Sequence, residues 1–247
     1  MPFDQYGMPG NPYDAKQLVE YLKSNPSEAA FLTWTLNIEL TPVYAIAPMG
    51  GAFDIDVYKK LITFLENHIS PSSDDQHISR ISIPGVLSNK PTRLFSGQIV
   101  PTIVPQARGM WGWKTQSLIN AAKKSCDFNK EKSEKFDNQL KNFLERIYYE
   151  LHNLGESSSD RALNYAATNV VQVASILKDG SDKYQLDRIS VEKSKFCRMD
   201  SDCWDIKLIF FQTKSLVKPR KIYRFTIDVS DSLPVTVGKV KKWYSSS

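Results

Sequence analysis

The sequence predicts an α+β domain in which an antiparallel meander of strands has a long helical hairpin packed on it. Two stretches predict the hairpin, because apolar residues recur at helical spacing over 136–154 and again over 160–177, with Gly155 between them. Strand-like segments separated by short polar turns predict the meander in the last third of the chain. The strands of this meander are expected at 186–194, 204–212 and 221–229.

The first half of the chain adds shorter elements. Residues 1–13 hold three prolines and two glycines, so a lead-in loop is expected there and the domain is expected to span 14–244. Asp14 is the predicted N-cap of the first helix. Further elements are predicted as strands at 33–40, 43–47, 78–86 and 94–104 and as helices beginning at Pro26 and Asp54. Because strands flank the helices in sequence, the chain favours one mixed domain over two.

Composition excludes several classes of protein. Hydrophobic residues occupy 41% of the 247 positions, and no apolar run approaches the roughly 20 residues that a membrane-spanning helix needs. The N-terminus lacks the basic and apolar regions of a secretory signal, so we expect a cytoplasmic protein with no membrane partner. The three cysteines, Cys126, Cys197 and Cys203, are odd in number and sparse, which favours reduced thiols.

The net charge of +5 does not indicate a nucleic-acid partner. Its densest basic stretches, 214–221 and 239–242, fall where a hairpin turn and a chain end are expected, and solvated turns attract lysine. The basic residues also lack the interleaved aromatic side chains that stack on bases. We therefore expect no binding of nucleic acid.

The search for catalytic or metal-binding residues yields weak patterns. The three histidines, His68, His77 and His152, have no surroundings that indicate a triad, so no catalytic residue is predicted. Cys197 and Cys203 are the candidate metal ligands, because thiolates bind zinc, although five intervening residues exceed the usual spacing of a zinc knuckle. No cofactor is expected. The alternatives to reduced thiols are zinc bound by these two cysteines and, less favoured, a disulfide between them.

Two groups of residues are candidates for binding a peptide or a partner protein. Arg108, Trp111 and Trp113 lie in a glycine-punctuated segment read as a loop, where exposed tryptophans grip partners; the alternative is that both tryptophans pack into the core. Arg161, Tyr165 and Asn169 lie on one face of the second long helix, where they line a hydrogen-bonding groove or, equally, form an internal network.

Several stretches together resemble one family. They read NPYDAK (11–16), WTLNIELTPVYAI (34–46), SIPGV (82–86), DRALNYAATN (160–169), CR (197–198), DSDCWD (200–205) and YRFTIDVSD (223–231). None of these is a generic motif, and the match runs from about residue 11 to residue 243. The chain resembles the C-terminal domain of unknown function carried by the PatA and PatG types of subtilisin-like proteins in cyanobactin (patellamide-class) biosynthesis.

The resemblance implies a place in the maturation of ribosomally made cyclic peptides in cyanobacteria. The protease and macrocyclase activities of such proteins belong to a separate subtilisin-like domain, whose signatures have no counterpart here. The leading hypothesis is therefore a non-catalytic accessory domain that binds a precursor peptide or a partner enzyme of the pathway, or that forms a homodimer. The alternative is a tailoring enzyme, zinc-dependent through Cys197 and Cys203.

Overall fold

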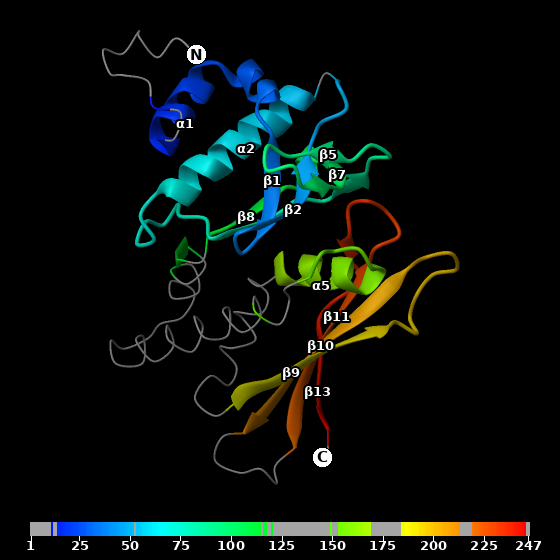
Figure 1. Cartoon of the computed structure of the whole chain (residues 1–247). Coiled ribbons are helices and arrows are strands. Elements are labelled where there is room, and N and C mark those ends of the chain that lie inside the picture. The colour runs from blue at the N-terminus through cyan, green and yellow to red at the C-terminus, as the bar shows by residue number, and fades with distance from the viewer. Residues whose placement is uncertain are drawn as a thin grey trace. The chain divides into compact units, whose positions relative to one another are not determined.

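The computed structural model (Figure 1) forms two compact units, residues 1–116 and 117–247, which are described one after the other. The residues that the structure describes are 11, 14–51, 53–114, 116–117, 120, 149, 153–168, 184–212 and 219–245. Both units contain helix and strand, so the predicted α+β class is confirmed. The extent of a single domain over 14–244 stays a prediction.

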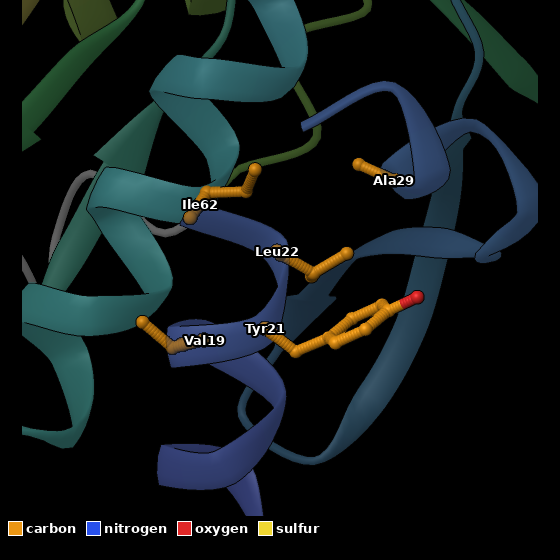
Figure 2. Packing of buried hydrophobic residues seen from close by; sticks show 5 residues of the cluster. All are labelled: Val19, Tyr21, Leu22, Ala29 and Ile62. Atoms are coloured by element: carbon orange, nitrogen blue, oxygen red, sulfur yellow. The ribbon is translucent and has the colours of Figure 1, made fainter. Parts of the chain in front are cut away.

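Three helical elements make one side of the first unit. They are α1 (Ala15–Ser24), the 3₁₀-helix η2 (Pro26–Phe31) and α2 (Asp54–Ile69). Asp14 caps α1 as predicted, because its carboxylate accepts a hydrogen bond from the Lys16 amide (2.9 Å). Figure 2 shows Leu22 of α1 at the centre of the cluster that joins these elements, with Ala29 and Ile62 beside it.

A four-stranded mixed sheet completes this unit. Its order is β1 (Trp34–Ile38), β2 (Thr41–Ile46), β7 (Thr102–Pro105) and β4 (Gly85–Leu87). Two small ribbons accompany it: β3 (Arg80–Ser82) with β8 (Trp111–Trp113), and β5 (Thr92–Arg93) with β6 (Ile99–Val100). Helix α2 runs obliquely over β1 and β2 and buries Val57 and Leu61 against Ile46 and Met110 (Figure 1).

The second unit is an antiparallel meander with a helix against it. The strands are β9 (Tyr184–Lys193), β10 (Cys203–Gln212), β11 (Arg220–Asp228), β12 (Val235–Thr236) and β13 (Lys241–Ser245). β10 lies between β9 and β11, and the outer side of β11 pairs with β12 and β13. Helix α5 (Ser158–Thr168) contacts β9, β10 and β11, so it packs on this sheet. The predicted meander is confirmed.

The structure refines several predicted elements. The strands expected at 78–86 and 94–104 are each divided, because Pro84 and Pro101 lack the N–H that a continuous ladder needs. Helix α5 begins where the serine-rich cap predicts, with the Asp160 amide donating to Ser157 Oγ (3.1 Å). Most of the helix expected over 136–154 and most of the lead-in loop lie outside the described residues, as does the end of the second helix. Within the described residues, no helix is both long and apolar enough to cross a membrane.

Leu22 is the side chain whose truncation tests the packing of the first unit. It is fully buried (0% exposed), so Leu22→Ala removes three carbons from a closed cluster. We expect a loss of about 2–5 kcal/mol in the free energy of unfolding, measured by urea denaturation. Leu40→Ala is the matched control, because Leu40 is 94% exposed, and it should change stability by less than about 0.5 kcal/mol. Equal effects of the two substitutions would contradict this core.

Candidate functional site

Strand β4 forms an open edge of the sheet in the first unit. Its neighbour in the sheet is β7. The Ser88 amide donates to the Thr102 carbonyl oxygen (2.8 Å), and the Gln106 amide, just after β7, donates to the Pro84 carbonyl oxygen (2.8 Å). Hydrogen-bonded and non-bonded pairs alternate along antiparallel strands, so the N–H and C=O groups of Gly85 and Leu87 point away from β7. No other described strand pairs with β4 on that side. The edge therefore offers two outward donors and two outward acceptors.

The side chains of β4 leave this edge accessible. Val86 and Leu87 are 55% and 56% exposed, so both faces of the short strand reach the surface. At Gly85 the strand comes so close to β7 that a Cβ atom would collide with Ile103 Cγ2 and the Val104 carbonyl oxygen. A residue other than glycine would push β4 away from the sheet. No residue of this edge is among the predicted site residues, although Pro84 indicates an edge or a bend at this point of the chain.

The three candidate residues of this unit have different environments. The segment read as a loop is instead the 3₁₀-turn η3 (Ala107–Gly109) followed by β8, because Gly112 allows β8 to lie close against Ile78. Arg108 is exposed, and Trp111 is 49% exposed opposite Ser82. Trp113 is only 5% exposed, so it belongs to the core, as the alternative interpretation held.

Arg108 and Trp111 lie near the start of β4. Trp111 pairs with Ser82, which precedes Gly85 by three residues. Arg108 follows Gln106 by two residues, and the Gln106 amide donates to the carbonyl oxygen of Pro84, the residue before β4. Lys60 of α2 holds this turn by donating to the Ala107 carbonyl oxygen (2.5 Å). An exposed aromatic and an exposed cation thus flank one end of the open strand edge.

The candidate residues on α5 belong to the second unit. Arg161 donates a short hydrogen bond to the Asp231 carbonyl oxygen, and its neighbour Asn164 donates to Asn153 Oδ1 (2.9 Å). Tyr165 is partly buried, and Asn169 lies outside the described residues. The contacts of Arg161 and Asn164 are of the internal kind that the alternative interpretation described.

The second unit also contains a disulfide between Cys197 and Cys203, whose Cα atoms are 5.6 Å apart. The expectation of reduced thiols at these positions is wrong for this structure. Pairing of Lys193 with Trp204 closes the β9–β10 connection and brings the two cysteines together, which their sequence spacing alone does not reveal. Zinc binding by this pair stays a prediction and requires the reduced thiolates, because a disulfide sulfur is a poor ligand.

A buried ion pair lies on β10 and β11 near this disulfide. Asp205 is 6% exposed, accepts a hydrogen bond from Thr226 Oγ1 (2.6 Å) and faces Arg224 Nη1 at 3.4 Å. The Arg224 guanidinium also lies 5.0 Å from the ring centre of Phe196, which the disulfide loop carries. The buried Nε of Arg224 has no hydrogen-bond partner among the described residues. Arg224 and Phe196 are not among the candidate site residues predicted from the sequence.

These features describe an α+β protein with an open strand edge in one unit and a disulfide-closed loop in the other. Family models match two parts of the chain: PatG Domain over residues 4–89 and PatG C-terminal over residues 130–243. The chain is also similar to a solved structure described as the PatG domain of unknown function, at 41% identity and a TM-score of 0.89. That match covers 98% of this chain and 91% of the other. No curated protein matches.

The chain belongs to the PatG domain-of-unknown-function family. The resemblance stated from the sequence is thereby confirmed.

Asp202 makes the disulfide loop sensitive to acid. A hydrogen bond from Lys193 Nζ (2.6 Å), with further ones from Ser158 and Trp204, lowers the pKa of this carboxyl below its ordinary 3.8. A lowered pKa stabilises the fold above pH 3.8, and the contribution is lost as pH falls through the folded-state pKa.

We expect Asp202→Asn to cost up to about 1 kcal/mol at neutral pH, because the pair is partly exposed. The difference from the parent should shrink as pH falls from about 4 to about 2, measured by urea denaturation at each pH. Glu20→Gln, at an exposed position of α1, is the control and should show little effect at either pH. A cost for Asp202→Asn that is constant with pH would contradict this account.

Proposed function

We propose that this chain is a non-catalytic accessory module of cyanobactin-type peptide maturation, and that it binds an extended segment of the precursor peptide by strand addition at β4. Membership of the PatG domain-of-unknown-function family supports the pathway. The observation that carries the proposed activity is the outward-facing backbone of Gly85 and Leu87 at the edge of the sheet.

The geometry of the edge matches an extended peptide. Gly85 and Leu87 are two residues apart, which is the repeat at which the backbone of an incoming antiparallel strand presents its own N–H and C=O pair. Up to four hydrogen bonds result, each contributing about 0.5–1.5 kcal/mol net of the water that it replaces. Because these bonds alone give only weak binding, side-chain contacts have to supply the remaining affinity.

Trp111 and Arg108 are placed to supply such contacts. The indole of Trp111 already exposes about half of its surface, so covering it removes apolar area from water at little cost in side-chain entropy. The exposed guanidinium of Arg108 binds a carboxylate of the peptide in a bidentate manner. Backbone pairing makes the site tolerant of peptide sequence, and these two residues select the register.

Leu87→Lys tests the strand edge. A lysine on an edge strand opposes further pairing, so we expect calorimetric titration with precursor peptide to give at least a tenfold weaker affinity than the parent chain. Asn37→Lys is the matched control, because Asn37 is an exposed residue of β1 at the opposite edge of the same sheet, and it should bind as the parent does.

Hydrogen exchange distinguishes the possible occupants of the edge. Peptide binding at β4 should protect the amides of Gly85 and Leu87, which point outward, and should leave the already bonded Ser88 amide unchanged. If the same two amides gain protection with protein concentration and without peptide, the occupant is a second copy of the chain. If a partner enzyme alone protects them, the peptide assignment is wrong. Binding of peptide without their protection would place the site elsewhere.

A further inference from the structure

Breaking the Cys197–Cys203 disulfide affects the loop between β9 and β10 and leaves the pairing of the two strands intact. The strands on both sides of its loop are joined independently of the sulfur atoms, because Lys193 pairs with Trp204 and the Ser194 amide donates to the Cys203 carbonyl oxygen (2.9 Å). The disulfide therefore closes a small ring on top of a ladder that persists without it. Opening the ring releases the loop and keeps β9 and β10 together.

The two sulfur atoms differ in their access to solvent. Cys203 is 1% exposed at the start of β10, whereas Cys197 is partly exposed between the exposed cations Lys195 and Arg198. An incoming thiolate reaches the Sγ of Cys197 more readily, and the two cations attract it there. The carbonyl oxygen of Ser201 lies 3.1 Å from the same Sγ and accepts a hydrogen bond from the thiol once it forms.

We propose that Cys197 and Cys203 form a thiol–disulfide exchange site whose substrate is a dithiol. One thiolate of the dithiol attacks Cys197 Sγ, the bond to Cys203 breaks, and Cys203 leaves as a thiolate that takes up a proton. The second thiol of the substrate loses its proton and attacks the mixed disulfide, which expels Cys197 as a thiolate that is then protonated. Two electrons pass to the protein, and the substrate becomes a disulfide.

Reduction changes the surface of the second unit. The loop carries Phe196, which is 65% exposed and lies 5.0 Å from the Arg224 guanidinium and 5.3 Å from Lys241 Nζ. With the ring open, the disulfide no longer restrains the loop that carries this aromatic side chain. The site lies in a different unit from β4, so it does not depend on strand addition.

Two single-cysteine variants test which sulfur is attacked. In a full-length Cys126→Ser background, Cys203→Ser leaves Cys197 as the reactive thiol, and Cys197→Ser leaves Cys203. We expect glutathione disulfide to modify Cys197 at least about ten times faster than Cys203, measured by mass spectrometry over time. Equal rates, or faster modification of Cys203, would overturn the proposal.

The unsubstituted chain provides a second measurement that does not depend on how the variants fold. Alkylation of the oxidised protein after denaturation should label one thiol per chain, and dithiothreitol added under native conditions should raise this number to three. Hydrogen exchange over 195–200 should then rise at least about tenfold, while β9, β10 and β11 exchange as before. Three thiols before reduction, a disulfide that survives excess dithiothreitol, or an unchanged loop would each refute the exchange site.

Discussion

The pairing of β10 on both of its sides is the constraint on which the second unit depends. Its register places Lys207 opposite Arg224 on one side and Ser190 on the other, and it places Asp205 opposite Thr226. A slip of one residue would turn every side chain to the other face of the sheet. The Asp205–Arg224 ion pair is buried and costly to desolvate, so it forms only in the correct register and penalises the alternatives.

In the first unit, backbone pairing determines which strand is left at the open edge of the sheet. β7 pairs in parallel with β2 and antiparallel with β4, so it has a neighbour on both sides, while β4 is paired on one side only among the described strands. Pro84 at the start of β4 and Pro105 at the end of β7 keep this pairing short. A three-residue strand with one open side is too short to add much stability, yet it has free backbone groups at the surface.

Local patterns predicted the elements of the chain better than they predicted its sites. The short polar turns between them located β9, β10 and β11, and burial alternates residue by residue along β11. Ser157 and Asp14 marked the caps of α5 and α1. The disulfide was only the least favoured alternative, because two cysteines six positions apart come together only when β9 and β10 pair. Trp111 and Trp113 differ in exposure because of how β8 packs. Since both are tryptophans, residue type alone could not predict which one is buried.

The open edge could not be assigned to β4 from the sequence for a more general reason. Its outward-facing groups are the N–H and C=O groups of Gly85 and Leu87, which every residue except proline possesses, so no side-chain motif marks them. Their availability depends on which strand lies last in the sheet, a property of the whole unit. A module that recognises its partner through backbone pairing therefore has no constellation of reactive side chains to find.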